Sequence, residues 1–259
     1  MKILYLFVVV FARDSKYVLE KIKELDMIDV PYIIVCGEHI NHPKVVYRAP
    51  RGKYDAINFA EKLIPKDVDV VTFNDVDARI CNFRAMCSHF KDRKVAIVFA
   101  SEFVREGPQH LFFKILNPIR KLVPVAGSGE LMMINRAVLS KILPLKACKA
   151  EDTYIMFKTY ELGYKVVFCK EVTTETKRTT FAEQEEDYKR RTVAGIYQAL
   201  SYSKPPLTVR LFYLLLPLMS PLLLIIGKKG YYWTKGILLG LIDFIRGDRT
   251  GIWKTNYLD

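Results

Sequence analysis

The sequence predicts an α/β protein with a doubly wound, mostly parallel sheet, and two observations support this fold class. Short apolar runs alternate along the chain with segments whose apolar residues recur at helical spacing, which is the order that parallel sheets require. Acidic residues follow several of these runs, at the ends of expected strands where such sheets bind their ligands.

The first half of the chain contains four expected strands, at residues 3–11, 32–36, 44–47 and 69–73. The first run ends at Arg13 without a small-residue cleavage pattern, so we interpret it as a buried strand and not as a signal peptide. Helices are expected over residues 15–25, capped by Asp14 or Ser15, and from Arg51 to Ile64.

The second half predicts strands at residues 95–101, 131–134 and 165–169 and a helix at residues 150–162. The basic segment Lys189-Arg190-Arg191 leads into a further expected helix that ends near Lys204. An amphipathic helix is expected between Pro108 and Leu122. The pair Pro205-Pro206 marks the expected boundary between a catalytic domain, residues 1–204, and a C-terminal segment, residues 205–259.

The C-terminal segment is expected to form an apolar helical hairpin. Leu211 to Ile226 has no charged residue, although it contains Pro217 and Pro221, and Tyr231 to Ile245 is apolar again after a Gly-Lys-Lys-Gly turn. Without a polar stripe such a segment has no side to expose to water, and the flanking basic and aromatic residues suit a membrane interface. We therefore favour a membrane-embedded or interfacial hairpin over a buried helix pair.

The composition limits the cellular compartments and the classes of partner that are compatible with this chain. The formal net charge of +12 favours an anionic partner, which is a nucleic acid, an acidic membrane face or a phosphorylated substrate. The five cysteines form no C-x-x-C pair and their number is odd, so a reduced, cytosolic setting fits better than a disulfide framework. A nucleic-acid binder would explain the charge but not the acidic residues at the strand ends, so no nucleic-acid partner is expected.

Asp75-Val76-Asp77 follows the strand expected at residues 69–73 and is the first chemical candidate. Carboxylates at i and i+2 of a strand end can face one pocket, and carboxylate oxygens are ligands for hard divalent cations such as Mn²⁺ or Mg²⁺. A cation held in this way can neutralise the negative charge of a diphosphate leaving group. Taken alone, the same pattern is also typical of a solvated turn.

Glu151-Asp152 opens the helix expected at residues 150–162 and has two interpretations. Acidic residues at a helix start interact favourably with the helix dipole. Alternatively, one carboxylate is a general base that takes the proton of an acceptor hydroxyl.

With these motifs in order, residues 1 to about 200 resemble the family 2 glycosyltransferases, which have the GT-A fold. Five pieces carry the resemblance, namely the turn Ala12–Ser15, the G-K-x-x-A-x-N pattern at Gly52–Asn58, the F-x-D-x-D pattern at Phe73–Asp77, Gly127–Gly129 with the R-x-x-L pattern at Arg136–Leu139, and Glu151–Thr153 with Glu161–Val166.

The resemblance implies a metal-dependent, hexosyltransferase-like enzyme and a role for particular residues. Asp77 would bind the metal, and Asp75 would contact the nucleotide and support the metal. Asp14 and Glu38 would lie near the base and ribose of the nucleotide-sugar donor, and Lys53 near its base or phosphates. Asp152 would be the catalytic base of an inverting single displacement, and Glu151 would shape the acceptor pocket.

The chain departs from the family pattern at two places. Its second strand ends in Cys-Gly-Glu instead of paired Asp residues, and the Gln-x-x-Arg-Trp segment of processive members is missing. Arg190 or Arg191 remains to bind the leaving diphosphate, although a solvated helix face also explains these charges.

We expect a membrane-associated enzyme whose catalytic domain faces the cytoplasm and whose acceptor is lipid-linked or another glycan. Two alternatives stay open. One is a non-catalytic, membrane-bound relative with the same fold. The other is a sugar-nucleotide-forming nucleotidyltransferase, although the first strand lacks the glycine-rich loop that this class needs.

Overall fold

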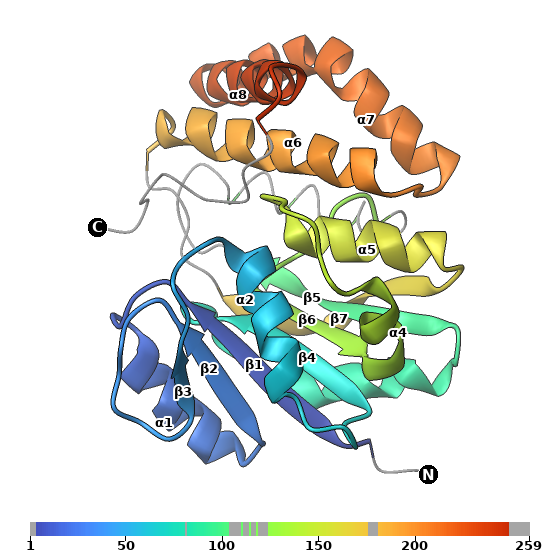
Figure 1. Cartoon of the computed structure of the whole chain (residues 1–259). Helices are drawn as coiled ribbons and strands as arrows, with labels where there is room; N and C mark the ends of the chain where they lie inside the picture. The colour runs from blue at the N-terminus through green and yellow to red at the C-terminus, as the bar shows by residue number, and fades with distance from the viewer. Residues whose placement is uncertain are drawn as a thin grey trace.

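The computed structural model describes residues 4–80, 82–103, 124–175 and 181–248, together with residues 110, 114 and 118. In this part of the chain, seven strands form one sheet in the order β3-β2-β1-β4-β6-β5-β7 (Figure 1). The strands are β1 (Leu6–Ala12), β2 (Tyr32–Cys36), β3 (Val45–Tyr47), β4 (Val70–Asp75), β5 (Val95–Phe103), β6 (Leu131–Asn135) and β7 (Lys165–Glu175).

The sheet is mostly parallel, as the sequence predicts. β1 runs parallel to β2 and β4, β2 to β3, and β5 to β7. Only β6, among the described strands, runs antiparallel to both of its neighbours, β4 and β5. The carboxyl ends of β1, β2 and β4 therefore share one edge, and the amino end of β6 reaches the same edge.

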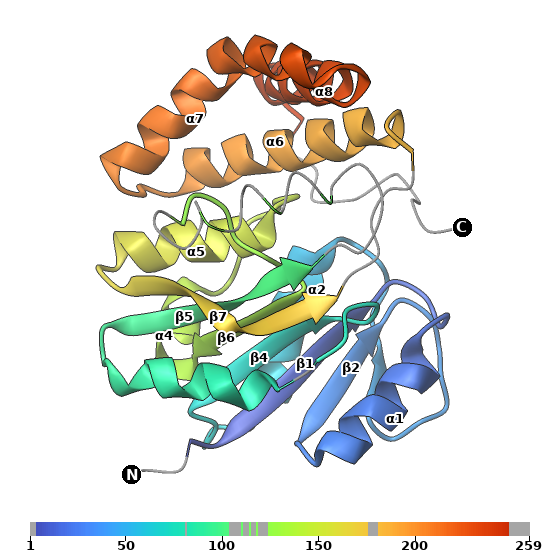
Figure 2. The ribbon, with the colours of Figure 1, turned by 180° about the vertical axis from the view of Figure 1, so that it is seen from behind.

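Helices cover both faces of the sheet. On one face lie α2 (Lys53–Ala60), which continues into the short 3₁₀ helix η1 (Glu61–Leu63), then α4 (Arg136–Ile142) and α5 (Glu151–Glu161). On the other lie α1 (Val18–Ile28) and the 3₁₀ helix η2 (Phe83–Lys91) (Figure 2). Alternate residues of β1 enter the two cores, with Val9 in one and Val8 in the other. A strand buried on both faces must be apolar throughout, which explains its sequence.

The predicted cap of the first helix is wrong. The helix begins at Val18, and no side chain caps it. Both predicted capping residues are engaged nearby, because the Ser15 hydroxyl donates to Glu38 over 2.6 Å and the Asp14 carboxylate accepts the amide of Lys16.

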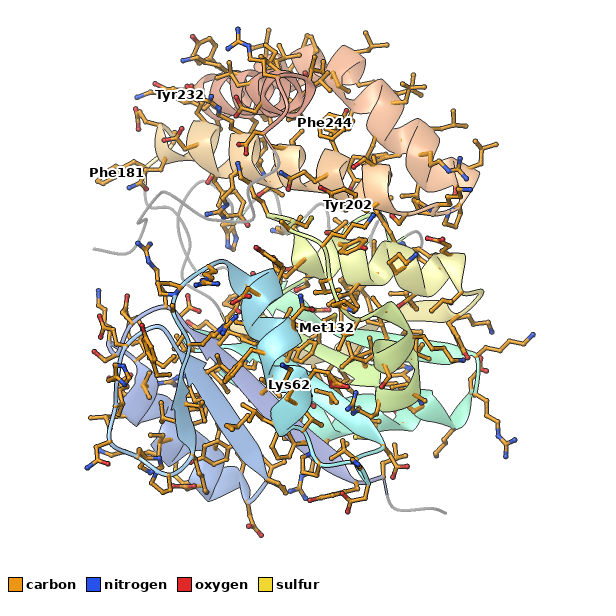
Figure 3. All side chains as sticks on the ribbon, in the orientation of Figure 1. Lys62, Met132, Phe181, Tyr202, Tyr232 and Phe244 are labelled. Carbon is orange, nitrogen blue, oxygen red and sulfur yellow. The ribbon has the colours of Figure 1, made fainter. Side chains whose placement is uncertain are left out.

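A further helical layer lies outside α5 (Figure 1) and consists of α6 (Gln184–Tyr202), α7 (Leu207–Met219), the 3₁₀ helix η3 (Ser220–Ile226) and α8 (Lys228–Ile245). α8 lies directly against α6, and a Cβ atom at Gly236 or Gly240 would come within 2.5 Å of an α6 carbonyl oxygen. Phe244 of α8 lies beside Tyr197 of α6, with ring centroids 5.6 Å apart (Figure 3).

The expected apolar hairpin is present as α7 with η3, followed by α8 after a turn at Gly227. The division at residue 204 stays a prediction, and the packing of α8 on α6 crosses that boundary. The amphipathic helix expected between Pro108 and Leu122 lies outside the described residues, apart from three isolated positions.

Candidate active site

β4 delivers the Asp75-Val76-Asp77 motif to the carboxyl edge of the sheet. Asp75 is the last residue of the strand, and both aspartates are partly exposed there. The buried Asn74 amide holds the turn that follows, because it donates to the carbonyl oxygens of Ala78 (3.1 Å) and Glu130 (2.6 Å). The motif is therefore tied to the start of β6 as well as to its own strand.

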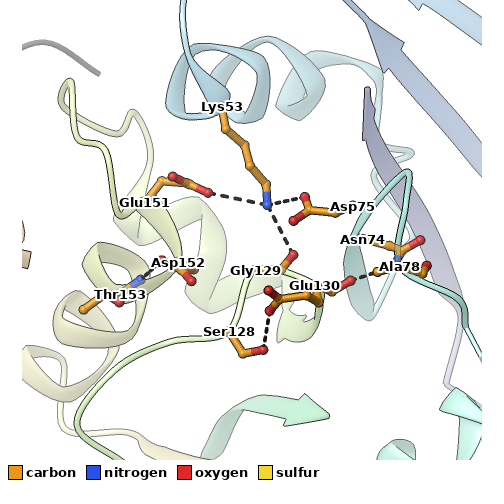
Figure 4. Close-up of polar contacts among 10 residues, drawn as sticks. All are labelled: Lys53, Asn74, Asp75, Ala78, Ser128, Gly129, Glu130, Glu151, Asp152 and Thr153. Carbon is orange, nitrogen blue, oxygen red and sulfur yellow. Dashed lines mark hydrogen bonds and ion pairs between the residues drawn. The ribbon is translucent and has the colours of Figure 1, made fainter. Parts of the chain in front are cut away.

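Lys53, the first residue of α2, joins three distant segments at this edge (Figure 4). Its ammonium nitrogen lies 2.5 Å from Oδ1 of Asp75 and 3.5 Å from Oε1 of Glu151, and it donates to the carbonyl oxygen of Gly129 over 3.2 Å. The structure thus brings together Lys53, Asp75 and the Glu151-Asp152 pair, all of which the sequence singles out.

The glycines at 127 and 129 allow the loop before β6 to lie against these groups. A Cβ atom on Gly129 would lie 2.9 Å from the Lys53 ammonium and 3.5 Å from Oδ2 of Asp152. One on Gly127 would lie 2.7–2.8 Å from backbone atoms of Asp152 and Thr153. The loop is also anchored by the Gly127 amide, which donates to the Thr153 hydroxyl.

The charges in this cluster are strongly coupled. Burial alone lowers the pKa of Lys53, but the carboxylates of Asp75 and Glu151 outweigh it, so the pKa lies above its ordinary value. Burial raises the pKa of Glu151 to about 7, against the opposing effect of Lys53. The carboxyl groups of Asp75, Glu151 and Asp152 outnumber the single ammonium group of Lys53 between them. This excess of acidic groups would favour the binding of a further cation.

A small cavity at the cluster is lined by Lys53, Ile57, Phe73, Gly129, Met132, Glu151 and Asp152. Met132 points from β6 toward the helices on this face (Figure 3). A larger open pocket of about 370 Å³ lies around Asn135 and Arg136, at the opposite edge of the sheet and away from these carboxylates. We assign the site by its chemistry and not by the size of the cavity.

Asp14 and Glu38 lie in the loops after β1 and β2, on the same edge as Asp75. Glu38 accepts hydrogen bonds from the hydroxyl and the amide of Ser15, and these bonds lower the pKa of its carboxyl. The two loops touch, since a Cβ atom on Gly37 would lie 2.1 Å from the Arg13 carbonyl oxygen. Both predicted donor-binding residues are exposed.

The two predicted arginines lie on α6 in different surroundings. Arg190 forms a two-bond ion pair with Asp243 of α8, at 2.5 and 2.8 Å. Arg191 is buried and lies one helical turn before Gly195, which packs on the backbone of Ala150 at the start of α5. Residues four apart share a helix face, so Arg191 belongs to the side of α6 that faces the Glu151 end of α5.

Two charged side chains of α1 support the motif, although the sequence did not identify them. The buried Lys21 of α1 donates to the Ala78 carbonyl oxygen over 2.6 Å, and Glu24 accepts the Ile80 amide. Burial lowers the pKa of Lys21, while Glu24 and then Asp77 and Asp75 oppose the change, so the ammonium lies near both aspartates. The signal was its spacing, because Lys21 follows Val18 by three positions on the buried helix face.

Glu130 is a third charged residue that the sequence did not identify. It directly precedes β6, is buried, and accepts a hydrogen bond from the Ser128 hydroxyl over 2.7 Å (Figure 4). A charged residue immediately before an apolar strand was the available signal.

No protein-family model and no curated protein matches the sequence. Solved structures do match. A mannosyltransferase from Pyrobaculum calidifontis, solved with GDP-Man and Mn²⁺, superimposes with a TM-score of 0.69 at 16% identity over 93% of this chain and 87% of its own. GalNAc-T7, solved with UDP, GalNAc and Mn²⁺, gives a TM-score of 0.56 at 12% identity over 95% of this chain and 56% of its own.

TarS from S. aureus gives a TM-score of 0.51 at 15% identity over 93% of this chain and 92% of its own. The protein therefore has the α/β fold of nucleotide-sugar-dependent transferases. Specifically, this is the GT-A fold, as the motifs predict.

Proposed function

We propose that the protein transfers a sugar from a nucleotide-diphosphate sugar to an acceptor hydroxyl or phosphate by a metal-assisted, inverting single displacement. The observation that carries the proposal is the convergence of Asp75, Glu151 and Asp152 around Lys53 at the carboxyl edge of a GT-A sheet. A fold alone does not define an activity, whereas this set of groups is suited to a diphosphate leaving group and a hydroxyl nucleophile.

Asp77 and Asp75 would hold a divalent cation, Mn²⁺ or Mg²⁺. The excess of carboxylates over ammonium groups fits such an ion, and two structural neighbours were solved with Mn²⁺. When bound, the ion supplies positive charge to the departing diphosphate. Lys53 would add a second positive charge beside it, and Arg191 is the better placed of the two arginines, because Arg190 is held by Asp243.

Asp14 and Glu38 would bind the nucleoside end of the donor. Their support is positional, since the loops after β1 and β2 adjoin β4 at the ligand-binding edge of the sheet. The hydrogen bonds from Ser15 keep the Glu38 carboxylate ionised and fixed in direction, ready to accept from sugar hydroxyls.

Asp152 would be the general base. Its Oδ1 accepts the Thr153 amide over 2.6 Å, which orients the carboxylate, and its Oδ2 faces Gly129. The acceptor oxygen attacks the anomeric carbon and loses its proton to Asp152 as the bond to the diphosphate breaks. Glu151 is buried against Lys53 and would shape the acceptor pocket and position that lysine.

The acceptor is proposed to be lipid-linked, with the protein held on the cytoplasmic face of a membrane. One described helix, Leu207–Ile226, is long and apolar enough to cross a bilayer, and only 22% of it is buried. Most of its large apolar side chains are exposed, among them Leu218 at 77% and Ile225 at 88%. Exposed apolar surface on this scale marks an interaction site.

The contacts of this helix favour lying in the interface over crossing the bilayer. Val209, Tyr213 and Ser220 form a buried stripe along its inner side. The Tyr213 hydroxyl donates to Val125 and the Tyr197 hydroxyl donates to the Tyr213 carbonyl oxygen. A helix docked along its length on a soluble layer can immerse only its outer side.

A second candidate function is a non-catalytic relative with the same fold. One contact favours it, since the Lys53 ammonium already neutralises Asp75 at 2.5 Å. A protein that keeps this pair closed would bind no donor.

Nucleoside-diphosphate release distinguishes the two. The purified full-length protein is incubated with a panel of sugar nucleotides, with Mn²⁺ or Mg²⁺, and with lipid-linked acceptors. We expect Asp77→Ala to lower turnover by at least about 100-fold and Asp152→Asn by about 10²–10⁴-fold. The exposed Asp67 at the far end of β4 provides the control variant Asp67→Asn, which should retain full turnover.

Donor binding separates chemistry from folding. Asp152→Asn should still bind the sugar nucleotide in calorimetry, because it acts on the acceptor side. If no sugar nucleotide binds to the wild-type protein, the non-catalytic alternative is correct. Turnover that survives both substitutions would exclude the proposed mechanism.

A further inference from the structure

A second group of metal-ligating side chains lies on the sheet face covered by α1 and η2, apart from the proposed active site. It consists of His89 from the last turn of η2 and of Cys169 and Glu171 from β7. Their potential ligand atoms all lie within 4.8 Å of one another.

An irregularity in β7 creates this group. Cys169 pairs with Ala100 of β5, but the next paired residue is Thr173, opposite Ser101, so residues 170–172 leave the ladder. Residues that leave a ladder in this way can redirect a side chain. Here the Glu171 carboxylate returns to the strand and accepts a hydrogen bond from the Cys169 thiol over 3.1 Å.

His89 approaches the same carboxylate from η2. Its Nε2 lies 4.0 Å from Oε2 of Glu171, which is too long for a hydrogen bond. Among the described residues its imidazole makes no hydrogen bond at all. Ligand atoms around one tetrahedral zinc ion lie roughly 3.2–3.8 Å apart, given bond lengths of about 2.0–2.3 Å. Two of the three separations, 3.1 Å between Cys169 and Glu171 and 4.0 Å between His89 and Glu171, bracket that spacing, and the third, between His89 and Cys169, is at most 4.8 Å.

We propose that His89, Cys169 and Glu171 form a zinc site that links η2 to the edge strand β7. The mixed sulfur, nitrogen and oxygen ligands favour Zn²⁺ over the Mg²⁺ or Mn²⁺ of an all-carboxylate site. The cysteine is fully buried and the glutamate side chain is 65% exposed, so the ion enters from solvent and keeps a water molecule as its fourth ligand.

Binding exchanges a proton for the metal. Burial raises the pKa of the Cys169 thiol, so the sulfur carries its proton before the ion arrives. The zinc–sulfur bond forms as that proton passes to solvent, and no oxidation or reduction is involved.

Cobalt substitution tests the site in the full-length protein. Metal-stripped protein is titrated with Co²⁺, and we expect the near-ultraviolet absorption band of a thiolate–cobalt bond to saturate at one equivalent. Cys169→Ser should abolish the band, and His89→Ala and Glu171→Gln should weaken Zn²⁺ binding by about 10–100-fold. Asp77→Asn, which alters the proposed donor site, should leave the band unchanged, as should the neighbouring control Cys87→Ser.

Thermal unfolding supplies the second measurement. Zinc at a hundredfold excess over its Kd should raise the midpoint of the wild-type protein by roughly 5–10 °C and leave that of Cys169→Ser unchanged. The metal-free midpoints of the two proteins should agree, which excludes misfolding of the variant. A band that is absent in the wild-type protein, or that persists in Cys169→Ser, would refute the site.

Discussion

Glu151 shows at the level of one residue how burial controls charge in this site. In the folded protein the Glu151 carboxyl keeps its proton up to a pH of about 7, because burial raises its pKa from the ordinary value of 4.5. Because the folded state binds the proton more tightly, the stabilisation is present at low pH and is lost as the pH rises from about 4.5 to about 7.

Glu151→Gln is therefore expected to remove this pH dependence. The wild-type protein should lose about 3.5 kcal/mol of unfolding free energy over this pH range, since a pKa difference from 4.5 to about 7 at about 1.4 kcal/mol per unit gives that value, and Glu151→Gln should not lose it. Urea unfolding of both proteins at pH 5 and pH 8 measures it, with the exposed Glu20→Gln as the control. Equal pH slopes for the wild-type protein and Glu151→Gln would contradict the assignment.

The two loop glycines are expected to respond differently to alanine. At Gly129 the added methyl group meets the flexible end of Lys53, so Gly129→Ala should displace the ammonium and lower turnover at least about 10-fold while changing stability by less than about 1 kcal/mol. At Gly127 it meets backbone atoms of Asp152 and Thr153, so Gly127→Ala should destabilise the fold by about 1–3 kcal/mol. Steady-state kinetics and urea unfolding of both variants test this, and the reverse pattern would contradict it.

At the scale of elements, the contact between α6 and α8 depends on missing side chains. Gly236 and Gly240 lie one turn apart and allow the two backbones to approach, and the Trp233 indole on the same helix donates to the buried Glu185 over 2.6 Å. The apolar sequence of α8, which suggests a membrane segment, therefore serves in part to pack this helix against α6 inside the protein.

Gly240→Ala should therefore destabilise the protein by about 1–3 kcal/mol, because its new methyl group would lie 2.5 Å from the Arg190 carbonyl oxygen. The neighbouring Leu238→Ala, at a position that is 39% exposed, should change stability by less than about 1 kcal/mol. Urea unfolding monitored by tryptophan fluorescence distinguishes them. If both substitutions cost the same, close packing of α6 and α8 is not what these glycines provide.

At the scale of the whole molecule, the proposed active site and the exposed apolar surface of α7 and η3 lie in different layers. The proposed site is at the sheet edge, whereas most of the large apolar side chains of α7 and η3 are exposed, and these helices belong to the outermost helical layer (Figure 1). If that layer contacts the membrane, the double variant Leu218→Glu/Ile225→Glu should reduce partitioning onto anionic vesicles by at least about 100-fold, given about 1.5–3 kcal/mol for each buried side chain.

Vesicle co-sedimentation measures this partitioning. Met27, which is 81% exposed on α1, gives the matched control Met27→Glu, which should bind vesicles like the wild-type protein. Unchanged partitioning of the double variant would exclude α7 and η3 as the membrane surface.

Features that depend on neighbouring residues could be predicted from the sequence, whereas features that depend on contacts between distant residues could not. Apolar runs identified all the described strands, and most clearly the central ones such as β1 and β4, because a strand buried on both faces needs a continuous apolar sequence. They did not reveal that β6 is antiparallel to its neighbours, since a buried strand has the same apolar composition whichever way it runs. The cap of α1 was mispredicted for a related reason, because Ser15 is used by Glu38, a residue 23 positions away.

The sequence by itself determined the GT-A class of sheet and singled out the candidate carboxylates Asp75, Asp77, Glu151 and Asp152, because periodicity and short motifs are local properties of the chain. Only the tertiary structure decided that Lys53 joins Asp75 to Glu151, that Arg190 is held by Asp243 and that Lys21 lies beneath the motif. These contacts connect segments that are 22 to 98 positions apart, and such distances in sequence are closed only by folding.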